Sequence, residues 1–102
     1  MKKIINGKKY DTETAKALGG EDTRSLSQTD FRYFWETLYV KKTGEYFLHG
    51  QGHGMTKYAT RDGLMACWGS AIIPLSVQDA KNWAEKNLDA DKFESIFGVV
   101  EE

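Results

Sequence analysis

FRYFWETLYVKKTGEYFLHG, residues 31–50, is the stretch that decides the fold. Its first half alternates as a β-strand does, and both faces hold large apolar groups. One face carries Phe31, Tyr33, Trp35, Thr37 and Tyr39, and the other carries Arg32, Phe34, Glu36, Leu38 and Val40. Residues 41–44 then predict a turn with Gly44 in the left-handed conformation, and residues 45–50 return as the partner strand. We expect this central hairpin to organise the molecule.

Upstream of the central hairpin, the sequence predicts a smaller hairpin and a short helix. Asn6-Gly7 readily adopts the positive φ angles of a tight turn, so residues 2–6 and 8–12 are expected to pair. Residues 12–18 offer a capping threonine and helix formers, and Gly19-Gly20 is expected to end a helix of about two turns. The polar residues 19–30 then predict a loop.

Downstream of the central hairpin, the pattern is less regular. Residues 50–54, which read GQGHG, hold too many glycines for a helix or a regular strand and predict a sharp change of chain direction. Residues 55–70 carry no decisive pattern. Residues 71–75 predict a short strand that Pro74, the single proline, either ends or holds at a sheet edge.

Two helices are expected after that strand. Ser76, with Asp79 three residues later, resembles a capping box with the shorter acid. Apolar residues then recur at helical spacing and predict an amphipathic helix over residues 76–88: Val77, Ala80, Trp83, Ala84 and Leu88. A second helix is expected from Asp89 or Asp91 to Phe97, ending at Gly98.

The fold class expected from these elements is α+β. A small antiparallel β-sheet built from hairpins would carry a short N-terminal helix, with the C-terminal helices packed on it. The 102 residues form a single domain, residues 1–102, because no linker or repeat divides them. A net charge of −1 argues against both a strongly basic nucleic-acid binder and an acidic nucleic-acid mimic.

Cysteine content and hydropathy indicate a cytoplasmic protein. The single cysteine, Cys67, has no internal disulfide partner, whereas small secreted domains usually carry several pairs. Before the first turn the basic N-terminus offers only two strongly apolar residues, Ile4 and Ile5, which is too few for a signal region. No stretch approaches the roughly 18 apolar residues of a membrane span, so no membrane contact is expected.

The residues with metal-binding or catalytic chemistry do not form a recognisable site. His49 and His53 have metal-ligand spacing on a helix, but the surrounding glycines oppose a helix and no paired-cysteine spacing supplies further ligands. Cys67 is expected to be a buried structural thiol. We therefore expect no catalytic residues, no metal and no cofactor. A metal or thiol enzyme built on His49, His53 and Cys67 is the third alternative for function.

Charge is divided unevenly along the chain. Residues 1–60 hold ten Lys and Arg against seven acids, and residues 61–102 hold four against eight, giving formal charges of +3 and −4. Such a dipole orients a charged partner during encounter. The candidate partner-binding residues are lysines of the predicted hairpins and acids of the predicted helices: Lys8, Lys9, Lys41, Lys42, Asp79, Glu85, Asp89, Asp91 and Glu94. For the acids, the ordinary alternative is a solvated helix face.

Aromatic residues near the lysines leave nucleic-acid binding open. Tyr33, Trp35, Tyr39 and Tyr46 lie near lysines of the two hairpins, and aromatics on a sheet beside lysines can stack bases and track phosphates. Thirteen aromatics in so small a chain are, however, first needed to build its core. Core packing is therefore the expected role of these rings.

Several segments form a recognisable set that spans nearly the whole chain. They read KIINGKKYDTETA at 3–15, ETLY at 36–39, KKTGEYFLHG at 41–50 and IPL at 73–75, followed by Ala80, WAE at 83–85, LDAD at 88–91 and IFG at 96–98. Together they resemble a family of small proteins encoded on phages and conjugative elements of Firmicutes. Some of its members are anti-CRISPR proteins that act against the type II RNA-guided nuclease. Residues 65–70, MACWGS, depart from a glycine-asparagine-tryptophan-serine pattern in relatives.

The resemblance implies an inhibitor, without any catalytic motif, whose partner is the type II CRISPR effector nuclease or its guide RNA complex. Type II inhibitors occupy the DNA-recognition groove, block nuclease domain movement or interfere with guide RNA and assembly. The acids of the C-terminal helices suit a basic groove, and the lysine hairpins suit guide RNA. The alternative is a nucleic-acid-binding accessory or regulatory protein of the same mobile elements. The oligomeric state stays undetermined.

Overall fold

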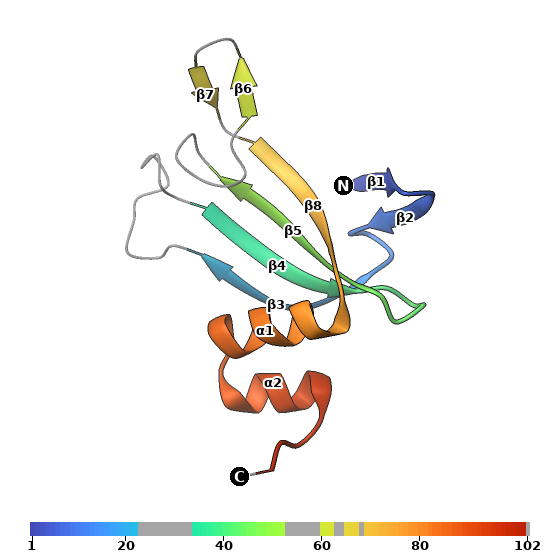
Figure 1. The fold of residues 1–102 in the computed structure, drawn as a ribbon, viewed down its shortest axis with the longest axis vertical. Helices are drawn as coiled ribbons and strands as arrows, with labels where there is room; N and C mark the ends of the chain where they lie inside the picture. Colours follow the sequence, from blue (N-terminus) through green and yellow to red (C-terminus); the bar gives the residue numbers. More distant parts are fainter. Residues whose placement is uncertain (23–33, 53–59, 63–64, 68, 102) are drawn as a thin grey trace.

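The computed structural model describes residues 1–22, 34–52, 60–62, 65–67 and 69–101. Its centre is a four-stranded antiparallel sheet in the order β3-β4-β5-β8 (Figure 1). The strands are β3 (Lys16–Asp22), β4 (Phe34–Val40), β5 (Tyr46–Gly52) and β8 (Gly69–Leu75). The described elements therefore form an α+β fold, as the sequence predicts.

Two small hairpins and two helices complete the described elements. Strands β1 (Lys2–Ile5) and β2 (Lys8–Asp11) form a two-stranded sheet of their own, as do β6 (Thr60–Asp62) and β7 (Met65–Cys67). Helices α1 (Val77–Asn87) and α2 (Ala90–Phe97) follow β8 directly in the chain. In Figure 1 the β1–β2 hairpin lies beside β8 and away from the two helices.

The predicted central hairpin is confirmed over the described residues. β4 and β5 pair so that Val40 faces Tyr46, and the turn between them places Gly44 at φ +91°. The backbone N–H of Gly44 donates to the carbonyl of Lys41 at 2.9 Å, which closes the turn. Residues 31–33 of the predicted strand lie outside the described residues.

The alternation of β4, β5 and β8 divides the core between two faces of the sheet. On the face that α1 covers, called the helix face below, the fully or nearly buried Leu38, Leu48 and Ala80 form one cluster. On the opposite face, which the β1–β2 hairpin covers and which is called the hairpin face, the buried Tyr10, Phe47 and Ile72 form the other cluster. The sheet is therefore covered by α1 on one side and by the β1–β2 hairpin on the other.

The predicted N-terminal helix over residues 12–18 is wrong, because the chain makes one turn and enters a strand. The Asp11 carboxylate accepts a hydrogen bond from the backbone N–H of Glu13 at 2.9 Å, and the Asp11 carbonyl accepts one from Ala15 at 3.0 Å. β3 then begins at Lys16 and pairs with β4, with a register shift between Ala17 and Gly19. Backbone pairing with a neighbouring strand outweighs the weak helix propensity of this segment.

The two glycines expected to end that helix instead lie inside β3. Gly19 has a packing reason for lacking a side chain, because a Cβ there would lie 2.9 Å from Leu88 Cδ2. The predicted loop over residues 19–30 is thus corrected at its start, where residues 19–22 belong to β3. Residues 23–30 lie outside the described part of the chain.

The prediction for the glycine-rich segment is also wrong over its first three residues. Gly50 and Gly52 are buried positions of the regular strand β5, and Gly50 pairs with Glu36 on one side and Ala71 on the other. Hydrogen bonding to β4 and β8 holds these glycines in the extended conformation, which they do not favour intrinsically. Residues 53 and 54 lie outside the described residues, and the undecided stretch 55–70 contributes β6, β7 and the start of β8.

The predicted strand at residues 71–75 and both C-terminal helices are confirmed. Pro74 lies in β8, which is the last strand of the sheet, so its missing N–H is tolerated at an edge. The Ser76 hydroxyl accepts from the Asp79 N–H at 3.0 Å and caps α1, and Asp89 caps α2 by accepting from Lys92 at 2.8 Å. α2 ends at Gly98, whose φ is +97°.

Candidate functional site

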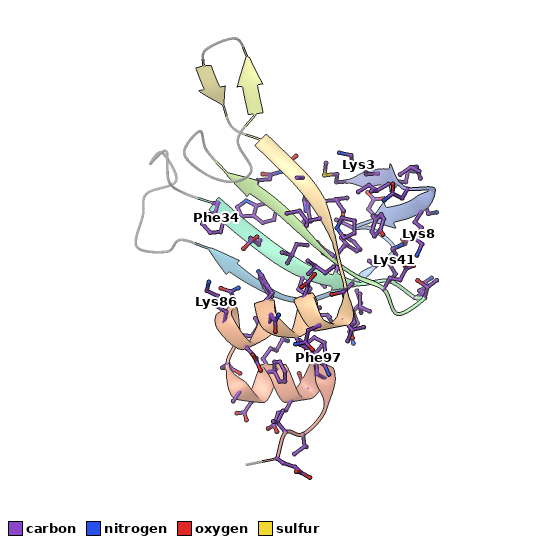
Figure 2. The ribbon with its side chains drawn as sticks, in the orientation of Figure 1. Lys3, Lys8, Phe34, Lys41, Lys86 and Phe97 are labelled. Atoms are coloured by element: carbon purple, nitrogen blue, oxygen red, sulfur yellow. The ribbon has the colours of Figure 1, made fainter. Side chains whose placement is uncertain are left out.

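The four lysines predicted to bind a partner meet in one hollow. Lys8 and Lys9 come from β2, and Lys41 and Lys42 come from the β4–β5 turn, more than thirty positions later in the chain. Figure 2 shows Lys8 and Lys41 next to each other. The hollow has a volume of about 480 Å³ and is lined by Lys8, Lys9, Asp11, Thr14, Lys41, Lys42, Thr43 and Glu45.

Two features of the sequence position this lysine hollow. Asn6 and Gly7 take φ values of 51° and 77°, as the tight turn of the β1–β2 hairpin requires. Tyr10 of the same hairpin is 5% exposed and meets the Phe47 ring edge-on, with 5.5 Å between the ring centroids. The Lys41 ammonium lies 3.7 Å from the centroid of the Tyr10 ring, which favours this contact as a cation–π interaction.

Glu45 connects the two pairs of lysines electrostatically. Its Oε2 lies 2.9 Å from Lys8 Nζ, and its Oε1 lies 3.3 Å from Lys41 Nζ. The hydrogen bond to Lys8, followed by that to Lys41, lowers the pKa of Glu45, and the same bond to Glu45 raises the pKa of Lys8. Glu45 is therefore ionised and Lys8 is charged at neutral pH.

The hollow keeps an excess of positive charge after this compensation. Its four lysines face two carboxylates, those of Asp11 and Glu45, which leaves a formal charge of +2. Within the described part of the chain, Lys9 and Lys42 are exposed and make no ion pair. A concave surface with unpaired ammonium groups attracts phosphates or carboxylates of a partner.

The five predicted acidic residues are only partly brought together. Glu85, Asp89 and Glu94 line a second hollow of about 470 Å³, whose apolar lining includes Leu88 and Phe93. In that hollow Asp89 is also the cap of α2, and the Glu94 carboxylate accepts from the Val100 N–H at 2.8 Å. Two of the three acids thus have structural roles.

The other two acids lie elsewhere on the helices. Asp79 belongs to the first turn of α1 and Asp91 to the first turn of α2. Both are exposed, and neither lines the hollow shared by the other three acids. Acids in a first turn favour the positive end of the helix dipole, so the solvated-face interpretation suits both.

The histidine and cysteine candidates are not assembled into a site among the described residues. His49 lies on β5, and its ring meets the Trp35 ring edge-on at 5.3 Å. Its buried Nε2 has no hydrogen-bond partner, and burial, with a smaller effect of the N-terminal ammonium, lowers the pKa of His49. His53 lies outside the described residues, and Cys67 belongs to β7. Residues 1–22, 34–52, 60–62, 65–67 and 69–101 contain no group of three His, Cys, Asp or Glu side chains able to hold a metal.

The aromatic rings near the lysines pack mainly inside the molecule. Phe47 is fully buried, and Tyr39 stacks on it with ring centroids 5.1 Å apart and planes 7° apart. Tyr46 is half-buried against Phe97, at 5.5 Å between centroids. Core packing is thus the described role of Tyr39 and Phe47, Tyr46 packs on Phe97 and also lines a hollow, and Tyr33 lies outside the described residues.

Several residues of the site were missed by sequence reasoning. The sequence predicts Glu45 only as the first residue of a returning strand, whereas in the structure it neutralises part of the lysine charge. Asp11 and Thr14 reach the hollow because of the turn at residues 11–15. The sequence signal for that turn is Asp11 itself, because an Asp side chain commonly accepts a hydrogen bond from the backbone N–H two residues later, which forms an Asx-turn.

The comparisons with known proteins add no family to this description. No protein-family model, no curated protein and no solved structure matches the chain. None of the helices among the described residues is long and apolar enough to span a membrane.

Proposed function

We propose that this protein is a stoichiometric inhibitor of a type II RNA-guided CRISPR nuclease, carried by a mobile element and acting in the cytoplasm of the bacterial host. It binds the nuclease or its guide RNA complex and is not consumed or turned over. The lysine hollow is the contact surface. The proposal rests first on the sequence resemblance and then on the geometry of the lysine hollow.

One observation carries the proposal. All eight lining residues of the hollow belong to two of the segments that resemble the inhibitor family, residues 3–15 and 41–50. These segments are far apart in the chain, and the fold joins them through Tyr10 on Phe47 and through Lys8 with Glu45. Two of the segments that carry the resemblance therefore meet at one surface, which supports that surface as the binding site.

The charge of the hollow supports binding by occupancy. A formal charge of +2 with two exposed, unpaired lysines attracts an acidic or phosphate-rich surface and raises the rate of encounter. An effector that holds its guide or target in a defined channel loses activity when one inhibitor occupies part of that channel. One bound molecule per nuclease is then sufficient.

The test is DNA cleavage by several guide-loaded type II nucleases at increasing amounts of inhibitor. Complete inhibition is expected near one inhibitor per nuclease, and adding the inhibitor before or after guide RNA separates blocked assembly from blocked DNA binding. Inactivation of a large excess of nuclease by trace inhibitor would show turnover and would overturn the occupancy mechanism. Unchanged cutting by every nuclease at large excess would remove the function for those nucleases.

Charge-neutralising variants identify the contact surface. Lys9→Gln/Lys42→Gln removes two exposed charges from the hollow, and Lys81→Gln/Lys86→Gln removes two charges from α1 as a matched control. Inhibition is expected to weaken in the first variant and to persist in the second.

A third variant tests the acidic helices. Glu85→Gln/Asp89→Asn/Glu94→Gln removes three charges while keeping oxygen acceptors for the hydrogen bonds from Lys92 and Val100. Inhibition is expected to persist in this variant. Loss of inhibition here, with full inhibition by the Lys9 and Lys42 variant, would move the contact surface to the helices.

The second candidate is a nucleic-acid-binding accessory or regulatory protein of the same mobile elements. The unpaired lysines of the hollow also favour this candidate, because positively charged ammonium groups bind the phosphates of nucleic acids. Binding to DNA or RNA alone, weakening steeply with salt and without any effect on nuclease cleavage, would select this candidate.

A further inference from the structure

We propose that the lysine hollow is the first part of a longer track that binds a single strand of nucleic acid, running along the edge of the sheet to α2. The proposal rests on the proposed function, because it takes the lysine hollow as the contact surface. It specifies that the partner presents a single strand of nucleic acid to that surface. It adds Lys16 and Lys92, which no sequence signal linked to the site.

Three hollows adjoin one another along this path. The lysine hollow shares Thr14, Lys41 and Lys42 with a hollow of about 330 Å³. That second hollow shares Lys16 and Val40 with a third of about 270 Å³, which is also lined by Lys92 of α2. The three hollows therefore adjoin one another in series from β2 to α2.

The track is strongly one-sided in charge. Its lining includes six lysines, Lys8, Lys9, Lys16, Lys41, Lys42 and Lys92, against the two carboxylates of Asp11 and Glu45. The formal charge rises from +2 in the first hollow to +4 over the track. Among the residues that the structure describes, Lys16 and Lys92 are exposed and make no ion pair. A run of unpaired cations along a depression suits a polymer with regularly spaced negative charges.

The lining between the lysines favours a nucleic-acid strand over an acidic peptide. Val40 and the half-buried Tyr46 line the third hollow together with Lys16 and Lys92. An aromatic ring beside cations is the arrangement on which an unpaired base stacks while its phosphates meet the lysines. β3 is the end strand of the sheet, so its outer backbone edge has no strand partner among the described residues and offers further N–H donors. A flexible single strand can bend from one hollow to the next, whereas a duplex is stiff over the length of a domain this small.

The experiment measures binding of fluorescent oligonucleotides to the full chain in the absence of any nuclease. Strands of about 4, 8 and 16 nucleotides, the size range of known single-strand sites, are titrated at several salt concentrations. Lys16→Gln/Lys92→Gln is compared with the wild type and with Lys81→Gln/Lys86→Gln, which has the same net charge.

The expected result depends on strand length. Loss of two phosphate contacts lowers the magnitude of the salt slope by about 1.4 and weakens binding of the longer strands by about 25-fold at 0.1 M salt. The shortest strand, which needs only the first hollow, is expected to keep its affinity, and the control variant is expected to match the wild type.

Other results would overturn the track. An unchanged salt slope in the Lys16 and Lys92 variant would end it, as would equal weakening in the Lys81 and Lys86 control. Tighter binding of duplex or of polyglutamate than of single strands would assign the surface to a different partner. Nuclease inhibition without any binding of single strands would overturn the track and leave the proposed function standing. Binding of single strands without inhibition would overturn the proposed function and leave the track standing.

Discussion

The two faces of the four-stranded sheet are covered by elements of very different kinds. On the helix face, α1 follows β8 directly and places the fully buried Ala80 over Leu38 and Leu48. On the hairpin face, the covering element is a separate two-stranded sheet, which contributes one buried ring, Tyr10, to a cluster with Phe47 and Ile72. One face is covered by a chain neighbour, and the other by a distant segment.

The difference shows where structure and candidate function coincide. The helix face is closed by apolar packing and by a hydrogen bond from Trp83 Nε1 to the Glu36 carboxylate at 3.2 Å. The hairpin face is held by Tyr10 on Phe47, and the same hairpin supplies half of the lysines in the candidate site. Changes to the core of the hairpin face should therefore affect binding at the lysine hollow as well as stability, whereas changes to the buried core of the helix face, Leu38, Leu48 and Ala80, should affect stability alone.

The largest expected effect comes from removing the ring at the centre of the hairpin face. Phe47→Ala should lower the free energy of unfolding by about 3–5 kcal/mol, because a fully buried ring is replaced by a cavity. Leu38→Ala is the matched variant on the helix face and should cost about 2–5 kcal/mol. Urea unfolding measures both, and a loss below about 1 kcal/mol in either variant would contradict its central place in the core.

Hydrogen exchange in the same two variants sharpens the comparison. In Phe47→Ala, the amides of β1 and β2 should lose protection before those of α1, because the hairpin has no strand pairing with the main sheet. In Leu38→Ala, the amides of α1 should lose protection before those of the hairpin. The same order of loss in both variants would mean that the two faces open together.

A smaller effect is expected from the hydrogen bond between Trp83 and Glu36 on the helix face. Trp83→Phe removes one donor to a carboxylate that is 4% exposed, and should cost about 1–3 kcal/mol in urea unfolding. Glu36→Gln keeps an oxygen acceptor for the indole N–H and serves as the control. If Trp83→Phe left stability unchanged, the hydrogen bond to Glu36 would make no contribution to holding α1 on the sheet.

The cap of α1 tests how far the helix face depends on local sequence. Ser76→Ala leaves the Asp79 N–H without its side-chain acceptor and should cost about 1 kcal/mol. Ser76→Asp, which retains a capping oxygen, should restore most of that loss. Thermal unfolding followed by circular dichroism measures the series, and equal stability of all three proteins would show that packing of α1, not capping, sets its start.

The smallest expected effect is a pH dependence on the hairpin side of the sheet. Burial lowers the pKa of His49, so the unfolded chain takes up a proton at a higher pH than the folded chain. Its contribution to stability is therefore complete above the unfolded pKa of about 6.5 and is lost as pH falls from there through the folded pKa. His49→Leu should flatten this decline between about pH 7.5 and 5.5, above the range where carboxylates titrate. An identical decline in the variant would assign the effect to other groups.

Predictions from sequence succeeded where the signals act over a few residues. Asn6-Gly7 placed the first hairpin, Gly44 placed the central turn, and Ser76 and Gly98 marked the start of one helix and the end of the other. Each signal works through one turn or one cap, so its physical cause lies within four residues of its effect. The α+β class follows from these elements.

Predictions failed where a segment is ordered by a distant partner. Residues 16–22 are intrinsically neither good strand nor good helix, and pairing with β4 makes them a strand. Gly50 and Gly52 favour irregular structure, yet pairing of β5 on both sides holds them in a strand. Local propensity is worth tenths of a kcal/mol per residue and is readily outweighed by such pairing.

For the candidate site, the sequence by itself determined which residues carry charge and which turns present them: Lys8 and Lys9 after one hairpin turn, Lys41 and Lys42 in another. Only the tertiary structure decided that these four lysines share a hollow, that Glu45 neutralises part of it, and that Lys16 and Lys92 extend it. The physical reason is that this meeting depends on Tyr10 packing on Phe47 across 37 positions of chain, a contact that no local spacing encodes.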